Sequence, residues 1–353
     1  MSEVSSVGGS AGLDPGQRES ASTFVRYYSV ADRILGIKGV DEPVLNLAHD
    51  FLSGYYFKQT NLSATDQPVH LIEIHKSQPP VLSPAVSSFE IEDGRCFSTR
   101  DQITLEVNGS TIIIGPPQLR RTDIWLSEST AGRHPLALNN VILYAVQGAL
   151  RRAGLYQFHA GCVVSKKAGG AILLVGDSGS GKSTLTATLL LNGWRFVSDD
   201  NLLLRESAAG IEAWALRRYF TFDQATLKAC QLDVFAEAVG NRVPGKEEKL
   251  RFHARRAFPD QFVESCIPGA IVFPQITSKA TSHLEPLKQA DSLARLIRQC
   301  PWATCDAAAA PAHLQVLSKL ARQTRSYTLF AGQDVFEQPA SITELIAQQV
   351  EIL

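Results

Sequence analysis

The middle of the chain contains a glycine-rich segment that constrains the fold more than any other feature. The segment consists of Gly176, Asp177, Ser178, Gly179, Ser180, Gly181, Lys182, Ser183 and Thr184. Its GxxxxGKS spacing is that of a P-loop, in which backbone N–H groups surround a phosphate, the lysine reaches the β- and γ-phosphates, and the next hydroxyl binds Mg²⁺. The segment therefore predicts a phosphate site between a strand and a helix.

The residues on either side of this segment support that interpretation. Residues 171–175, AILLV, form an apolar run of strand length, and residues 184–191 contain good helix formers with apolar positions on one face. This order places the helix N-terminus, with its favourable dipole, at the phosphates. We therefore expect an α/β domain with ATP and Mg²⁺ as cofactors.

Two adjacent carboxylates follow soon after the glycine-rich segment. Asp199 and Asp200 come directly after a short run, RFVS, which favours a strand. Because ligands of open α/β sheets bind at the carboxyl ends of the strands, we expect the pair beside the loop. Phosphoryl transfer needs a Mg²⁺ ligand and a carboxylate that accepts the proton of the attacking hydroxyl. Neighbouring aspartates can divide these two roles.

Taken together, these segments resemble the catalytic domain of the HPr kinase/phosphorylase family. The resemblance covers residues 155–205. It is carried by FHAGCV (158–163), GDSGSGKS (176–183) and NGWRFVSDD (192–200), which follow one another in the family's order and at near-family spacing.

The resemblance implies an ATP-dependent kinase that transfers the γ-phosphate to a serine hydroxyl of a protein or peptide. By this resemblance Asp199 corresponds to the general base and Asp200 to its metal-side partner, which would share Mg²⁺ with Ser183. His159 corresponds to an active-site histidine, whose expected task is contact with phosphate or with the catalytic aspartate. Lys182 completes the predicted catalytic set.

One region departs from the pattern of the bifunctional enzymes. Those enzymes carry a downstream glycine-rich segment of the type RGxG, associated with the reverse, dephosphorylating reaction, whereas residues 215–223 here are ALRRYFTFD. The departure argues against phosphorylase activity and against HPr as the acceptor. The chain more closely resembles divergent HPr-kinase-like proteins, of the sort that resembles peptide-modifying kinases in bacterial biosynthetic clusters.

Two basic clusters could stabilise the charge of a phosphoryl-transfer transition state. One is Arg217 with Arg218. In the other, KLRFHARR, alternation along a strand would place four side chains on one face, where they could bind a phosphate or an acidic substrate. These four are Lys249, Arg251, His253 and Arg255. A solvated strand face is the alternative interpretation of the second cluster.

The whole chain predicts two domains after a tail. Residues 1–20 are rich in Ser and Gly with little to bury, so we expect a disordered tail. Residues 21–130 predict a smaller, strand-rich α+β domain that could recognise the substrate, with a hairpin turn at Asn108-Gly109. Residues 131–353 would form the kinase domain, beginning with an amphipathic helix over residues 136–153.

Composition excludes several other classes of protein. Lys and Arg number 34 and Asp and Glu 35, so the formal charge of −1 provides no basic field for nucleic acid or for an anionic membrane. Six scattered cysteines show neither metal-ligand spacing nor the pattern of a secreted disulfide framework. With no leader and no apolar run of the roughly 18 residues that a membrane span needs, we expect a cytoplasmic protein.

Two other functions stay open at this point. A small-molecule kinase, for free serine or an adenylylsulfate-like acceptor, would use the same loop, and Asp200-Asn201 resembles the acidic segment that follows the loop in adenylylsulfate kinases. A regulatory protein could bind ATP without transferring phosphate, although intact Lys182 and Ser183 favour a working site. The family's hexamers also leave a homo-oligomer open.

Overall fold

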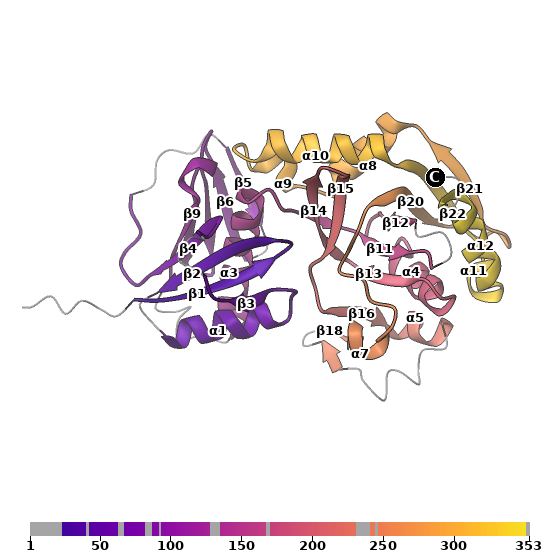
Figure 1. Ribbon diagram of the computed structural model, residues 1–353, viewed down its shortest axis with the longest axis horizontal. Helices are drawn as coiled ribbons and strands as arrows, with labels where there is room; N and C mark the ends of the chain where they lie inside the picture. Colours follow the sequence, from indigo (N-terminus) through magenta and orange to yellow (C-terminus); the bar gives the residue numbers. More distant parts are fainter. Residues whose placement is uncertain are drawn as a thin grey trace, which may run out of the picture.

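The computed structural model describes residues 23–39, 42–62, 67–81, 87–91, 93–127, 135–166, 170–230, 241–243 and 246–350. The tail expected over residues 1–20 and the domain boundary expected near residue 130 lie outside this part of the chain. In Figure 1 the indigo and purple N-terminal half occupies one end of the molecule, and most of the magenta to yellow remainder occupies the other.

The N-terminal half is built on one mixed sheet of nine strands, as its strand-rich pattern predicts. Its strands are β1 (Phe24–Val30), β2 (Arg33–Gly39), β3 (Lys58–Thr60), β4 (His70–His75), β5 (Ser87–Ile91), β6 (Gly94–Ser98), β7 (Ile103–Val107), β8 (Ser110–Ile114) and β9 (Arg121–Trp125). They are ordered β3-β1-β2-β4-β9-β8-β7-β6-β5. The strands β2, β4 and β9 are parallel, and β9 to β5 form an antiparallel meander.

The predicted hairpin turn is present between β7 and β8. Val107 pairs with Ser110, and the two residues between them, Asn108 and Gly109, have φ angles of +51° and +76°. Positive φ at both central residues is what a two-residue type I′ turn requires, which is why an Asn-Gly pair predicted it.

Two helices cover this sheet, α1 (Glu42–Ser53) and α3 (Pro135–Arg152), and a short 3-10 turn, η1 (Pro117–Leu119), precedes β9. The predicted apolar face of α3, which includes Val141 and Ala145, is buried in the same core as Ile112 and Ile124 of the sheet. The helix predicted to open the kinase domain thus packs on the N-terminal sheet. The division into domains itself stays a prediction.

The second half is organised around a six-stranded sheet. Its strands are β11 (Gly161–Val164), β12 (Ala171–Leu174), β13 (Arg195–Ser198), β20 (Pro268–Ile276), β21 (His283–Leu287) and β22 (Arg325–Ala331), in the order β13-β11-β12-β20-β22-β21. The strands β12, β20 and β22 are parallel. Because β13 and β12 are both antiparallel to β11, they too share one direction, so all four strands end at one edge.

Two smaller sheets and eight helices complete the described part of this half. One sheet contains β10 (Tyr156–His159), β14 (Asn201–Ser207), β15 (Gly210–Ala215) and β19 (Ser265–Cys266), and the other contains β16 (Tyr219–Asp223), β17 (Asn241–Val243) and β18 (Lys246–His253). The helices are α4 (Lys182–Leu191), α5 (Gln224–Ala229), α7 (Ala254–Ala257), α8 (Gln289–Arg298), α9 (Trp302–Cys305), α10 (Ala310–Gln323), α11 (Asp334–Glu337) and α12 (Pro339–Val350), of which α9 lies close to the N-terminal half.

Alternation along β12 separates two cores. Ile172 and Leu174 pack in the core that contains α4 and α12, whereas Leu173 packs in the core that contains Leu296 of α8 and Leu317 of α10. Both faces of the central sheet are thus covered, as a parallel sheet requires. Its carboxyl edge is left for function.

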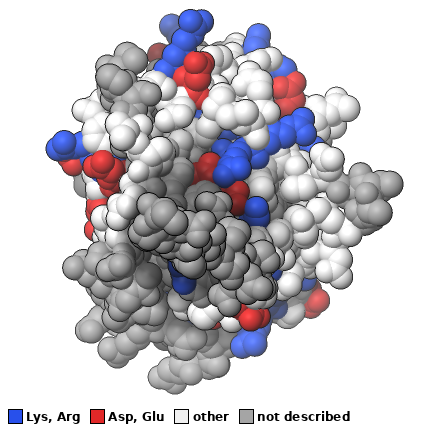
Figure 2. All heavy atoms as spheres, turned by 90° about the vertical axis from the view of Figure 1, so that its left-hand side faces the viewer, with Lys and Arg blue, Asp and Glu red and all other residues white. Residues whose placement is uncertain are grey.

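Two further observations concern the charged surface and the apolar character of the helices. On the end formed by the N-terminal half, acidic and basic side chains lie interspersed among uncharged ones (Figure 2). Among the described residues, no helix combines the length and the apolar character that a membrane crossing requires.

Candidate active site

The glycine-rich segment forms the connection between β12 and α4. Gly179 and Gly181 have φ angles of +79° and +93°, a region that side chains disfavour. A Cβ atom on Gly176 would lie 2.8 Å from Ser180 Oγ, so the loop closes tightly on itself. The Ser180 hydroxyl is buried and has no hydrogen-bond partner within the described part of the chain. The loop is therefore a tight backbone turn at the N-terminus of helix α4, and the Ser180 hydroxyl within it could bind a ligand.

Lys182 is held against this loop. Its Nζ atom donates to the carbonyl oxygens of Gly176, at 2.6 Å, and of Asp177, at 2.9 Å. Burial of the side chain lowers the pKa of the ammonium group, and the charge of Asp200 opposes that shift. Two of the three N–H donors of a lysine are used by the loop. The third is available for an anion.

Asp199 lies beneath the edge of the sheet. The residue follows β13 directly and is only 4% exposed. Its Oδ2 atom accepts a hydrogen bond of 2.8 Å from the backbone N–H of Thr221 in β16. Burial, together with the neighbouring charge of Asp200, raises the pKa of the Asp199 carboxyl to about 7.

Asp200 is open to solvent, with 36% of its side chain exposed. The Nε2 atom of His159 lies 3.2 Å from its Oδ1 atom, and Nη1 of Arg217 lies 3.4 Å from its Oδ2 atom. Burial lowers the pKa of His159, and the charge of Asp200 opposes that shift. A neutral imidazole can donate one N–H to the carboxylate.

The topology of the central sheet explains why these residues meet. The strands β12 and β13 end at the same edge, and β11, which lies between them, begins there two residues after His159. The loop therefore follows one strand, the aspartates follow another, and the histidine precedes the strand in the middle. The structure brings Lys182, His159 and Asp200 together at this edge, and the aspartate that His159 contacts is Asp200, whereas the resemblance implied Asp199 as the catalytic aspartate.

The first basic cluster divides between two tasks. Arg217 contacts Asp200, but Arg218 turns to the N-terminal half, where it donates to the carbonyl oxygens of Tyr55 and Phe57 at 2.6 and 3.2 Å. Tyr55 and Arg217 also pair as an isolated β-bridge. The segment after α1 is thus attached directly beside the candidate site.

The second basic cluster is not the continuous strand face that alternation predicts. Lys249, Arg251 and His253 lie in β18, which ends at His253. Arg255 lies in the short helix α7 and pairs with Glu264 at 2.8 Å, so its predicted place on the strand face is wrong. The guanidinium of Arg251 stacks on the ring of Tyr219, 5.7 Å from its centroid.

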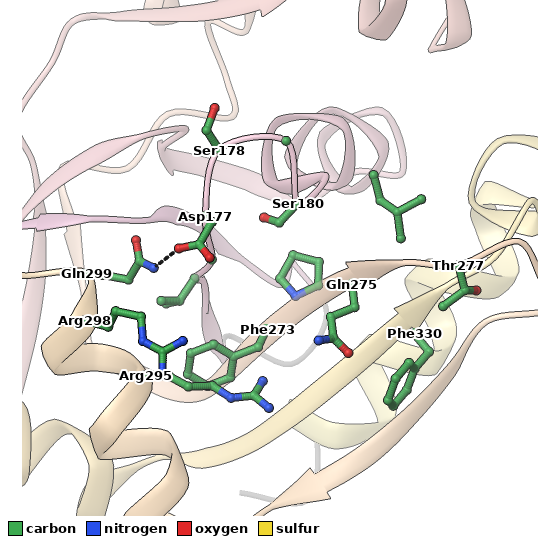
Figure 3. A pocket seen from close by; sticks show the side chains of 15 residues that line it. Asp177, Ser178, Ser180, Phe273, Gln275, Thr277, Arg295, Arg298, Gln299 and Phe330 are labelled. Carbon is green, nitrogen blue, oxygen red and sulfur yellow. Dashed lines mark hydrogen bonds between the residues drawn. The ribbon is translucent and has the colours of Figure 1, made fainter.

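A cavity of about 660 Å³ lies against the loop on the side of α8. Figure 3 shows the Arg295 and Arg298 side chains in it, below the Asp177 carboxylate, which accepts a 2.7 Å hydrogen bond from Gln299. Sequence reasoning did not select these α8 residues. Their spacing of three places two arginines on one helix face, and this is the signal that could have indicated them.

Comparisons with known proteins give a distant structural likeness. No family model and no curated protein matches the chain. Among solved structures, the Hpr(Ser) kinase/phosphatase from Coxiella burnetii is similar over 54% of this chain and 94% of that chain, with 12% identity and a TM-score of 0.28. This is a distant structural relation.

Proposed function

We propose that this protein is an ATP-dependent kinase that transfers the γ-phosphoryl group to a serine hydroxyl of a protein or peptide. The observation that carries the proposal is the solvent-accessible contact of Asp200 with His159, at the same edge of the sheet as Lys182 and its loop. A phosphate-binding turn and an accessible carboxylate are the two parts that phosphoryl transfer to an alcohol needs.

The residues at this edge fit Mg·ATP. The tight turn at Gly176, the unpaired hydroxyl of Ser180 and the spare N–H of Lys182 suit a phosphate chain. Mg²⁺ prefers oxygen ligands, and the Ser183 hydroxyl with an aspartate would supply them. Burial opposes the ionisation of the Asp199 carboxyl. A nearby cation would favour its ionised form. Bound there, Mg²⁺ would neutralise charge on the phosphates.

The exposure of the two aspartates favours the reverse of the roles that the family resemblance implies. An incoming alcohol must reach the proton acceptor, and Asp199 is buried and already hydrogen-bonded to Thr221. We therefore assign the general base to Asp200 and the metal side to Asp199 with Ser183. His159 then acts as a positioning residue that orients the Asp200 carboxylate.

In the proposed step the serine oxygen forms a bond to the γ-phosphorus while the bond from that phosphorus to the β–γ bridging oxygen of ATP breaks. The hydroxyl proton passes to Asp200, and ADP leaves with the electron pair. The positive charges of Lys182 and Arg217 stabilise the charge on the transferring group. The acceptor chain would lie over Tyr55 and the exposed Arg251, next to the reacting carboxylate.

Calorimetric titration with Mg·ATP tests the nucleotide part of this proposal. We expect the wild-type protein to bind, and Lys182→Ala to bind at least about tenfold more weakly, because a charged hydrogen bond to phosphate is lost. Ser183→Ala should weaken the Mg²⁺-dependent part of binding. Lys288→Ala, an exposed lysine at the start of α8, is the matched control. Equal binding by Lys182→Ala and the control would contradict the proposal.

A further inference from the structure

A narrow apolar slot of about 70 Å³ adjoins the arginine-lined cavity, with which it shares Ser180, Pro274 and Ile276 as lining residues. Gly181 and Thr184 form its inner end, at the start of α4, and Ile276, Gly332 and Phe336 form its walls. Figure 1 shows the elements that contribute these walls, β22 and α11, beside α4. The slot thus begins where the phosphate loop ends.

The walls of this slot are rigid before any ligand arrives. The backbone N–H of Thr277 donates to Ala331 at 2.9 Å, and that of Gln333 donates to Lys279 at 3.0 Å. Ser282 accepts from the Gly332 N–H and donates its own hydroxyl proton to Asp334. Two loops at the carboxyl edge of the sheet are therefore joined to each other along their length, although their apolar residues are left uncovered.

The slot exposes two large apolar side chains. Ile276 is 68% exposed and Phe336 is 52% exposed. Exposed apolar side chains are common singly, but two that face one crevice indicate a ligand. Aromatic and aliphatic walls suit a flat, weakly polar ring, which can stack on the ring of a phenylalanine.

We propose that this slot holds the base of the donor nucleotide and that it does not distinguish adenine from guanine. The inference rests on the proposed function. A nucleotide held by its β-phosphate in the loop carries its nucleoside away from the α-phosphate, past the first turn of α4, where Thr184 lines the slot.

The lack of discrimination follows from hydrogen bonds that are already made. Among the described residues at the slot, the N–H groups of Gly332 and Gln333 and the carbonyl of Ala331 have partners within the protein, and Thr184 Oγ1 pairs with Thr226. The Ser180 hydroxyl, which also lines the slot and has no partner among the described residues, is the group that we assign to the phosphate chain. A site rejects a close analogue strongly only where it hydrogen-bonds the distinguishing group, and an apolar pocket does not. ATP and GTP should therefore bind alike.

Titration of three probes, Mg·ATP, Mg·GTP and magnesium tripolyphosphate, tests this inference. We expect ATP and GTP to bind with affinities within about tenfold of each other. Phe336→Ala should weaken both nucleotides by about tenfold, from lost stacking, while leaving tripolyphosphate unchanged. Ile276→Ala should act in the same direction. Leu119→Ala, an exposed apolar residue of η1, is the matched control.

The possible failures are distinguishable. If nucleotides bind but neither Phe336→Ala nor Ile276→Ala changes their affinity, the base does not lie in this slot, while the proposed kinase function stands. If the protein binds ATP more than about tenfold more tightly than GTP, the proposal that the slot does not distinguish the two bases is overturned. If neither nucleotide nor tripolyphosphate binds the wild-type protein, the proposed function fails first, and this inference fails with it.

Discussion

The Nε2 atom of His159 lies 3.2 Å from Oδ1 of Asp200, and this contact joins the ends of two strands that belong to different sheets. Arg217 approaches the other oxygen of the same carboxylate. The carboxylate is thus fixed between an imidazole and a guanidinium, yet it stays exposed. Such an arrangement orients a base while leaving it accessible to an incoming hydroxyl.

Removing the base should separate binding from transfer. In Asp200→Asn we expect Mg·ATP affinity close to that of the wild type and a transfer rate lower by about 10²–10⁴, the usual loss when a positioned general base is removed. Asp260→Asn, on an exposed turn, is the control. The two variants are compared by calorimetry for binding and by single-turnover transfer for the rate. A loss of binding as large as the loss of rate would contradict the assignment.

His159 should act through the orientation of Asp200. Glutamine can offer an N–H from a similar position, whereas alanine cannot. We expect His159→Ala to lower the transfer rate by about tenfold or more and His159→Gln to restore much of it, with the pH profile otherwise unchanged. If the glutamine variant were as slow as the alanine variant and the profile lost a titrating group, His159 would be a proton carrier instead.

The buried Asp199 makes a pH-dependent contribution to stability. Its folded-state pKa is about 7, above the 3.8 of an ordinary aspartate. The folded protein therefore holds more protons than the unfolded chain between these values, and the free energy of unfolding falls as the pH rises through this window.

Asp199→Asn removes this dependence, because asparagine keeps an oxygen for the Thr221 N–H and has no charge to bury. Urea unfolding of both proteins from pH 4 to pH 8 measures the effect. We expect equal stability near pH 4 and an advantage for the variant above pH 7, on the order of 4 kcal/mol at most. A difference that stays constant with pH would show that the carboxyl does not titrate in this window.

A second buried carboxylate should matter for stability alone. Asp306 accepts hydrogen bonds from Arg151 and Arg152 at the end of α3, and all three side chains are almost fully buried. Asp306→Ala would leave two guanidinium groups buried without a counter-charge, at a cost of about 3–5 kcal/mol. Thermal unfolding beside Asp260→Ala tests this. A cost equal to that of the control would mean that the ion pair contributes nothing net.

Local patterns in the sequence predicted the local parts of this structure. The Asn108-Gly109 turn and the strand-loop-helix around Lys182 were predicted because a few consecutive residues decide each of them. The family resemblance implied that His159 contacts phosphate or the catalytic aspartate, Asp199, and the sequence did not indicate that its partner is Asp200.

Features that depend on distant pairing were not predicted. The strand alternation that put Arg255 beside Arg251 failed, because helix α7 begins at Ala254. The contact between Tyr55 and Arg217 joins two halves of the chain, and no periodicity within either half indicates it. Burial distinguishes Asp199 from Asp200, and adjacent identical residues carry no such signal in the sequence.

Phosphoryl transfer from [γ-³²P]ATP with Mg²⁺ tests the central claim most directly. The acceptors are the proteins and peptides encoded beside this gene, with free L-serine in a separate reaction, and wild type is compared with Asp200→Asn. The account predicts label on a serine of a protein or peptide with the wild type and a rate lower by about 10²–10⁴ with the variant. Transfer by Asp200→Asn at the wild-type rate, or label on free serine alone, would contradict it.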